Sequence, residues 1–214
     1  MSMQPRLIVF GGGGHAKVVL DAAAKSRHFS EIQLADDDPA TWGKRILGHP
    51  VMGGREALLA LPGERPQVIV AIGGNRIRCE VAEWLQEHGF ELATVIHPSV
   101  QLGEGVRIGA GSFLAAGVVV NCDTVLAANV IVNTSASVDH DCRVAAGVHL
   151  APGCRLCGHV SVGKQSFLGA GVVVIPSLNI GESVMVGAGS TVIGDLADAA
   201  RVAGSPARPL SAEA

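Results

Sequence analysis

The segment Asp139-His140-Asp141 sets one imidazole between two carboxylates, a combination that can accept and return a proton. Imidazole titrates close to neutral pH, so it can take a proton from an amine or hydroxyl group as that group attacks. A neighbouring carboxylate fixes the tautomer of the ring and stabilises the imidazolium that forms. His140 is therefore the strongest candidate for a general base, with Asp141 or Asp139 as its partner.

A second group of residues, near the N-terminus, has the pattern of a phosphate-binding loop. Gly11-x-Gly13-x-x-Ala16 follows an apolar strand and opens a helix, where backbone N–H groups can meet a phosphate. An ordinary strand–helix turn explains the same glycines. Arg78 can neutralise a diphosphate or can be a solvated helix residue. The candidates for binding a nucleotide sugar are Gly13, His15, Asp36, Asp37, Asn75 and Arg78.

A small α/β domain is predicted to position these N-terminal candidates. Apolar runs predict strands over residues 7–10, 32–35 and 68–72, with helices over 16–25 and 76–88. Their alternation predicts a parallel sheet, half of a Rossmann-like fold. The apolar face of the second helix is formed by Ile77, Val81, Trp84 and Leu85. A half-size domain over residues 1–95 argues against NAD and for a mononucleotide or a nucleotide sugar.

The chain changes period after residue 95. A step of six from Ile96 meets an aliphatic residue every time up to Val192, and a small or aliphatic residue follows four positions after each. This hexapeptide period is typical of a parallel β-helix, in which three successive hexads close one triangular coil. His140, two positions after the inward Val138, should face outward. An all-β domain is thus predicted over residues 96–214, including a C-terminal tail.

Composition narrows the possible partners. Aromatic residues make up only 3% of the chain, so aliphatic side chains must fill the core. A net charge of −3 gives no reason to expect nucleic acid or an anionic membrane as partner. No apolar run approaches the roughly 18 residues that cross a bilayer. Five cysteines, an odd number, in a chain without the pattern of a signal peptide predict reduced thiols and a cytoplasmic location.

In combination, these motifs resemble the NeuD/PglD-type sugar acetyltransferases, a hexapeptide-repeat family that includes bacillosamine-pathway and perosamine enzymes. The likeness covers essentially the whole chain. Besides the hexads, it is carried by segments 11–17 (GGGGHAK), 36–39 (DDDP), 138–142 (VDHDC), 148–153 (VHLAPG) and 202–208 (VAGSPAR). The resemblance implies a left-handed β-helix and a homotrimer. It also implies acetyl-CoA lying between adjacent β-helices and a sugar nucleotide held partly by the N-terminal domain.

The resemblance also implies roles for single residues. It makes His140 the base and favours Asp141 as the residue that orients it. His149, at the last position of its hexad, should also face outward and contact the thioester region, unless it is only a solvated histidine. Coenzyme A should lie along the later coils, although turn geometry explains the glycines there equally well. The cofactor-binding candidates are His149, Gly158, Gly169, Ala170, Gly187, Ala188 and Arg208.

The expected function is acetyl-CoA-dependent N-acetylation of a UDP- or GDP-linked 4-amino-4,6-dideoxy sugar, for glycan assembly. Sialic-acid-type O-acetylation remains open, since the same base serves an alcohol. A non-catalytic scaffold or a sugar-nucleotide binding module is a third interpretation. No metal is expected: the zinc-binding γ-class carbonic anhydrases use two histidines five residues apart, and His97, His140, His149 and His159 lack that spacing. The Cys154-x-x-Cys157 pair is interpreted as packing rather than redox chemistry.

Overall fold

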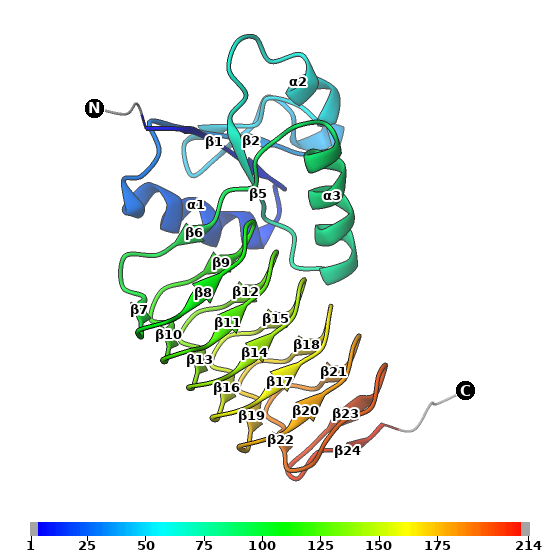
Figure 1. Ribbon diagram of the computed structural model, residues 1–214. Helices are drawn as coiled ribbons and strands as arrows, with labels where there is room; N and C mark the ends of the chain where they lie inside the picture. Colours follow the sequence, from blue (N-terminus) through cyan, green and yellow to red (C-terminus); the bar gives the residue numbers. More distant parts are fainter. Residues whose placement is uncertain (1–3, 211–214) are drawn as a thin grey trace. The chain divides into compact units, whose positions relative to one another are not determined.

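The structure is a computed structural model that describes residues 4–210 (Figure 1). The chain divides into two compact units, Met1–Pro98 and Ser99–Ala214. This division falls three residues after the end of the predicted 1–95 domain. Residues 211–214 of the predicted second domain lie outside the described residues. Within residues 4–210, no helix has both the length and the apolar character needed to span a membrane.

The first unit is built on a three-stranded parallel sheet with the order β2-β1-β5, which confirms the predicted α/β arrangement (Figure 1). Its strands are β1 (Arg6–Phe10), β2 (Glu31–Ala35) and β5 (Gln67–Val70). β5 ends two residues before the predicted Ile72. Its partner strand β1 ends at Phe10, which pairs with Val70, and beyond this point the carbonyls of Ile72 and Gly73 accept hydrogen bonds from the Arg78 guanidinium.

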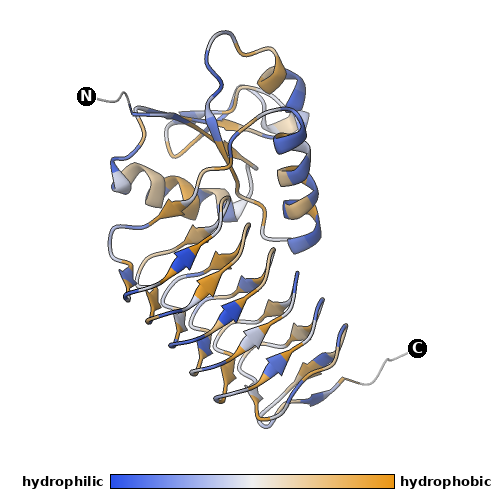
Figure 2. Ribbon diagram, viewed as in Figure 1, coloured by the Kyte–Doolittle hydropathy of each residue, from blue (hydrophilic) through white to orange (hydrophobic). Residues whose placement is uncertain are grey.

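Two long helices accompany this sheet, as predicted: α1 (Gly14–Ser26) and α3 (Asn75–Glu87). In the ribbon coloured by hydropathy, the residues of α1 are mostly hydrophobic, whereas those of α3 are largely hydrophilic (Figure 2). On α3, Val81 and Leu85 are buried as expected, but Ile77 is 47% exposed. Ile77 stands in the first turn of the helix, where it lines a pocket.

Several short elements between residues 39 and 59 were not predicted from the sequence. They are a 3₁₀ turn (Pro39–Thr41), strands β3 (Arg45–Ile46) and β4 (His49–Pro50), which pair antiparallel, and helix α2 (Arg55–Leu59). Each is too short to show a period in the sequence. β6 (Val95–Ile96) lies near the end of the unit.

The second unit is a parallel β-helix, as the hexads predict (Figure 1). The strands are very short, and successive coils pair in parallel, as Val119 does with Ser137, except that β23 and β24 at the end pair antiparallel. One sheet contains β7 (Gln101–Leu102), β10 (Val119–Val120), β13 (Ser137–Val138), β16 (Arg155–Leu156), β19 (Val173–Val174) and β22 (Thr191–Val192). A second contains β8 (Arg107–Ile108), β11 (Val125–Leu126), β14 (Arg143–Val144), β17 (Ser161–Val162) and β20 (Asn179–Ile180). The third contains β9 (Phe113–Leu114), β12 (Ile131–Val132), β15 (His149–Leu150), β18 (Phe167–Leu168), β21 (Met185–Val186), β23 (Arg201–Ala203) and β24 (Arg208–Pro209).

The core of the β-helix is the column of hexad aliphatics. From Leu114 to Val192, every one of these side chains is at most 3% exposed. Leu102, on the first coil of the unit, departs from this rule and is 46% exposed. The inward column leaves the turns between strands free to carry polar side chains. Because residues one coil apart stack on one another, two such side chains on neighbouring coils can meet.

Candidate active site

His140 and Asp141 occupy the turn that follows β13, on the outside of the β-helix. Asp141 has a left-handed backbone conformation (φ 58°), which Asp tolerates better than most residues. The His140 Nδ1–H donates to Asp141 Oδ2 at 2.8 Å. The two side chains are 51% and 45% exposed, so the pair is open to a ligand. The exposure of His140 agrees with its predicted outward register.

The hydrogen bond between these two residues sets their protonation. It raises the pKa of the His140 imidazole and lowers the pKa of the Asp141 carboxyl. With Asp141 ionised and accepting the Nδ1 proton, the neutral ring keeps its lone pair on Nε2. The arrangement can therefore accept a proton at Nε2 while the carboxylate stabilises the imidazolium.

Asp139 supports the backbone of this turn rather than the ring. Its Oδ1 accepts the backbone N–H of His140 at 2.8 Å and the Asn121 side-chain amide at 2.8 Å. The bond from Asn121 is the main reason why the pKa of Asp139 is lowered. Asn121 lies one full coil before Asp139, so the coil length could have identified it in the sequence. Of the two aspartates considered, the structure brings Asp141 onto the imidazole.

Gly158 makes room for the His140 ring. It lies one full coil after His140 and stacks directly on it. A Cβ atom added at this glycine would stand 2.6 Å from both Cε1 and Nε2 of the ring. Any other residue would therefore push the imidazole from its place and cover its Nε2 edge. This contact gives Gly158 a role beside the predicted one in cofactor binding.

His159, on the next coil, lies beside this turn, although the sequence contains no histidine pair with the spacing of the carbonic anhydrase zinc site. Its Nε2 lies 3.7 Å from Asp141 Oδ2, and its ring meets the His140 ring edge-on at 5.1 Å. One potential ligand atom from each of His140, Asp141 and His159 lies within 4.8 Å of the others. The expectation from the sequence considered only short spacings. His159 stands one position beyond the residue that stacks on His140, which places the two rings side by side.

His149 faces out of the prism as predicted, but neighbouring side chains bury it. It precedes the inward Leu150 on β15 and so points away from the prism interior, yet only 8% of it is exposed. Its ring packs edge-on against Phe167 at 5.2 Å, and its Nε2 lies 3.3 Å from the Asn133 side-chain nitrogen. The outward column of this sheet carries large side chains, and these exclude solvent. The alternative of a solvated histidine is therefore wrong.

The later coils contain the remaining cofactor candidates. A Cβ at Gly169 would stand 2.6 Å from the Ala188 nitrogen, and one at Gly187 would stand 2.8 Å from the Ala203 Cβ. Close approach of the next coil thus accounts for both glycines without a ligand. Ala170 and Ala188 are exposed. Arg208 is also exposed, and its Nη1 donates to the carbonyl of Ala207 at 2.9 Å.

The first unit has a pocket of about 440 Å³ at the carboxyl ends of its strands, where open parallel sheets bind their ligands. Four of the six predicted substrate-binding residues line it: Gly13, His15, Asp36 and Asp37. Gly13 and Gly14 have no atom within 4 Å of an added Cβ, so the loop that opens α1 presents its backbone freely.

Asp36 and Asp37 hold the loops around this pocket. Asp36 Oδ2 accepts the backbone N–H of Gly12, and Asp36 Oδ1 accepts that of Asp38 at 2.7 Å. Asp37 forms an ion pair with Arg55 at 3.0 Å, and the Arg55 guanidinium also lies over the Trp84 ring at 4.8 Å. Sequence reasoning missed Arg55, because the short helix that carries it has no periodic pattern.

Arg78 does not face solvent, so the interpretation as a solvated helix residue is wrong. Only 1% of it is exposed. Its guanidinium donates to the carbonyls of Ile72 (3.1 Å) and Gly73 (3.2 Å) and to Asn75 Oδ1 (2.9 Å). Burial lowers its pKa to about 10. Arg78 and Asn75 thus fix the loop between β5 and α3, and Gly73 in that loop lines the pocket.

His15 is held neutral beside this arginine. Burial, and next the charge of Arg78, lower the pKa of its imidazole to about 4. A neutral ring in the pocket can donate a hydrogen bond without adding charge.

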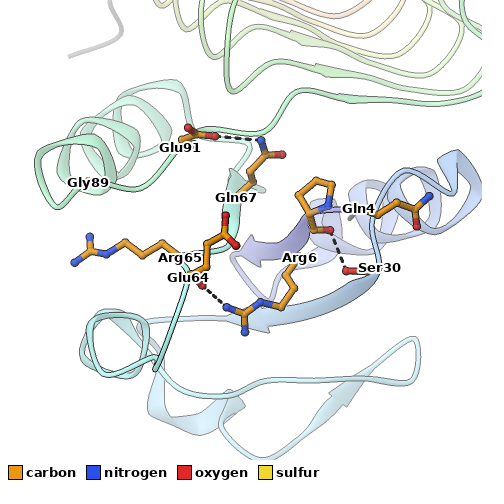
Figure 3. A pocket seen from close by; sticks show the side chains of 9 residues that line it. Gln4, Arg6, Ser30, Glu64, Arg65, Gln67, Gly89 and Glu91 are labelled. Carbon is orange, nitrogen blue, oxygen red and sulfur yellow. Dashed lines mark hydrogen bonds between the residues drawn. The ribbon is translucent and has the colours of Figure 1, made fainter. Parts of the chain in front are cut away.

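Two other features lie apart from these candidate residues. A hollow of about 740 Å³ lies at the amino ends of β1 and β5, where Arg6 donates to the Glu64 carbonyl and Gln67 to Glu91 (Figure 3). This is the sheet edge opposite to the one at which ligands bind in such folds. The Cys154 thiol is buried at its predicted corner, and burial raises its pKa to about 11. This fits packing rather than redox chemistry.

Comparisons with known proteins agree with this architecture. A family described as "PglD N-terminal domain" matches residues 6–85. A GDP-perosamine N-acetyltransferase from Escherichia coli is 28% identical over 169 residues, covering 78% of this chain and 76% of that protein. The acetyltransferase domain of PglB from Neisseria gonorrhoeae, in complex with acetyl coenzyme A, is 38% identical with a TM-score of 0.91, covering 97% of this chain and 100% of that one.

A third relative binds both a sugar nucleotide and the cofactor. It is a histidine-to-asparagine variant of perosamine N-acetyltransferase from Caulobacter crescentus, in complex with CoA and GDP-perosamine. It is 40% identical with a TM-score of 0.91, covering 96% of this chain and 97% of that one. The likeness thus extends over both units. The chain belongs to the NeuD/PglD-type family of sugar acetyltransferases.

Proposed function

We propose that this chain transfers the acetyl group of acetyl-CoA to the amino group of a nucleotide-linked 4-amino-4,6-dideoxy sugar, with His140 as general base. The observation that carries the proposal is the exposed His140–Asp141 pair, joined at 2.8 Å on the outside of a β-helix. The reaction is proposed from the relatives, which bind acetyl-CoA in one case and CoA with GDP-perosamine in another. Those relatives favour GDP over UDP as the carrier.

The chemistry follows from the protonation of the pair. The sugar amine attacks the thioester carbonyl, and Nε2 of His140 takes the proton that the nitrogen loses. Asp141 stabilises the resulting imidazolium through Nδ1–H. When the tetrahedral intermediate collapses, the carbon–sulfur bond breaks, and the proton on Nε2 passes to the departing sulfur. The products are the acetamido sugar nucleotide and CoA with a free thiol.

The sugar nucleotide is proposed to use the pocket of the first unit. The N-terminus of α1 and the backbone of the loop at Gly13 suit a diphosphate. His15, Asp36 and Asp37 supply neutral and acidic partners for the other polar groups of the nucleotide sugar. Asn75 and Arg78 are proposed to position the pocket wall rather than to touch the ligand.

Acetyl-CoA is proposed to lie along the later coils, against Gly158, Gly169, Ala170, Gly187 and Ala188, with Arg208 near its phosphates. A β-helix whose outer surface is a row of short turns offers little enclosure of its own. The second wall of the site therefore comes from a neighbouring copy, in a homotrimer. His149 is buried in this chain, so a contact with the thioester requires that the side chains packed against its ring move aside.

Product analysis tests the reaction. The chain is incubated with acetyl-CoA and, separately, with GDP- and UDP-linked 4-amino-4,6-dideoxy sugars and with a sialic acid. The products are treated with mild base and examined by mass spectrometry. A base-stable amide formed from an amino sugar nucleotide is expected. A base-labile ester on sialic acid alone would assign the chain to O-acetylation. Binding of a sugar nucleotide without any acetylated product would leave only a binding module.

A further inference from the structure

A side chain that the proposed acetyl transfer does not use lies beside the turn at His140. His159 reaches from the next coil to the same carboxylate oxygen, Asp141 Oδ2, that His140 contacts. Two imidazoles therefore share one carboxylate at an exposed position. His159 is held there by its own turn, where its φ of 59° matches the 58° of Asp141 one coil earlier.

We propose that His140, Asp141 and His159 bind a divalent transition-metal ion such as Zn²⁺, and that the bound ion inhibits the enzyme. One potential ligand atom from each residue already lies within 4.8 Å of the others. Two imidazoles and one carboxylate are ligand types that Zn²⁺ and Co²⁺ accept, and water can complete the shell at an exposed site. Mg²⁺ prefers oxygen ligands and should not compete.

Small side-chain rotations complete the site. Zn–N bonds are about 2.0–2.1 Å long, so the three ligand atoms must approach one another slightly around the ion. The His140 and His159 rings are free ends of exposed side chains, and their edge-on contact at 5.1 Å leaves both able to turn. The hydrogen bond between His140 and Asp141 is exchanged for bonds to the metal.

Inhibition follows from the electron pairs of the His140 ring, and this step rests on the proposed function. If the metal binds Nε2, it occupies the lone pair that would accept the proton. If it binds Nδ1, the proton of the neutral ring moves to Nε2, which then has no lone pair to offer. In either case the base is lost while metal is bound.

Direct binding tests the site without any acceptor sugar. Co²⁺ is titrated into the full-length protein, and its visible absorption is followed. Saturation at one ion per chain is expected, with Zn²⁺ displacing Co²⁺ and Mg²⁺ failing to do so. Loss of an outer-shell partner already costs about 10- to 100-fold in metal affinity, so His159→Asn should weaken binding at least as much.

Two further variants serve as controls. His28→Asn removes an exposed histidine of the first unit and should bind Co²⁺ like the wild type. Cys122→Ser removes the exposed thiol one coil below His140 and should also leave the affinity unchanged. No cobalt absorption, unchanged affinity in His159→Asn, or equal weakening by Cys122→Ser would overturn the assignment of ligands.

The inhibition is measured as the ratio of acetyl-transfer rates with and without Zn²⁺. In the wild type, half-inhibition should occur at the concentration that half-fills the site. In His159→Asn it should shift upward by the same factor as binding, whatever the basal rate of the variant. Metal binding without inhibition would refute the proposal that the bound ion disables His140. If the chain is inactive on every acceptor, the cobalt titration still decides whether the metal site exists.

Discussion

At the scale of single residues, substitutions can test whether activity depends on the hydrogen bond between Asp141 and His140 or only on a negative charge in a turn of the β-helix. Asp141→Asn keeps the shape but loses the charge that stabilises the imidazolium. We expect kcat to fall by about 10²- to 10⁴-fold, the range of a disabled general base, with little change in KM for acetyl-CoA. Steady-state kinetics with both substrates varied gives this split.

Asp123→Asn is the matched control. Asp123 occupies the equivalent turn position one coil earlier, with the same φ of 58°. It should therefore retain wild-type kcat. Equal losses in the two variants would show that a negative turn, and not the Asp141–His140 contact, matters.

A substitution at Gly158 tests whether kcat depends on the position of the His140 ring. Gly158→Ala puts a methyl group 2.6 Å from the ring atoms Cε1 and Nε2. Because the ring is the free end of a side chain, it can move aside at small cost in stability. We therefore expect an unchanged melting temperature and a kcat lowered by at least about tenfold. Gly194→Ala, where an added Cβ meets no atom within 4 Å, should change neither. Full activity in Gly158→Ala would mean that the ring position is not critical.

Among the secondary-structure elements, the loop between β5 and α3 is expected to depend on Arg78. Arg78→Met retains much of the volume and removes the donors to the carbonyls of Ile72 and Gly73. Loss of these hydrogen bonds from a charged donor should lower the unfolding free energy of the first unit by about 1.5–3 kcal/mol. Trp42 and Trp84, the only tryptophans, both lie in this unit, so urea denaturation followed by tryptophan fluorescence reports on it.

Arg76→Met is the comparison on the same helix. The Arg76 side chain is 74% exposed and pairs with Glu80 four residues on, a contact worth about 0.5 kcal/mol or less. A change in Arg78→Met no larger than this would contradict the structural role assigned to Arg78.

The half-buried His15 predicts a pH dependence of the stability of the first unit. Its pKa is about 4 in the folded chain, against 6.5 for an unperturbed histidine. The unfolded state therefore binds the proton first as pH falls, and stability is lost between these two values. The full shift corresponds to roughly 3 kcal/mol. As the pH is lowered, the urea midpoint followed by tryptophan fluorescence should decrease less steeply in His15→Gln than in the wild type. His28→Gln, an exposed control, should follow the wild type, and identical slopes in all three would refute the burial of a neutral His15.

The elements also show what the sequence can and cannot predict. The hexad aliphatics determine the β-helix because one inward residue per strand is a strict geometric requirement. The segment between residues 39 and 59 has no such requirement, so its short strands and helix could not be predicted. Arg78 was misread because an arginine on an amphipathic helix usually faces water, and only the loop carbonyls explain its burial.

Part of the site could be predicted by applying the coil length of 18 residues to the sequence. The pairs formed by His140 with Gly158 and by Asp139 with Asn121 are each one coil apart, and that period was available in the sequence. The contact of His159 with His140 was not predicted, because the spacing of the carbonic anhydrase site runs along the chain, whereas these two rings meet between neighbouring coils. The burial of His149 depends on the large neighbours in its outward column, which the inward hexad pattern does not describe.

In the whole molecule, two units divide two tasks. In the proposed function, the pocket of the first unit holds the sugar nucleotide, and the His140–Asp141 pair of the second unit acts as the base. Neither unit alone contains both, so acetyl transfer is expected to require the full chain. In the proposed homotrimer, each site would also require a neighbouring copy.

The decisive measurement is the rate of CoA thiol release at saturating acetyl-CoA and a GDP-linked 4-amino-4,6-dideoxy sugar, for the wild type and His140→Asn. The proposed mechanism predicts turnover by the wild type and a kcat lower by about 10²- to 10⁴-fold in the variant, because asparagine cannot accept the proton. An equal kcat in the folded variant would remove His140 from the role of base. The absence of thiol release from the folded wild type with any nucleotide-linked amino sugar would contradict the proposed function itself.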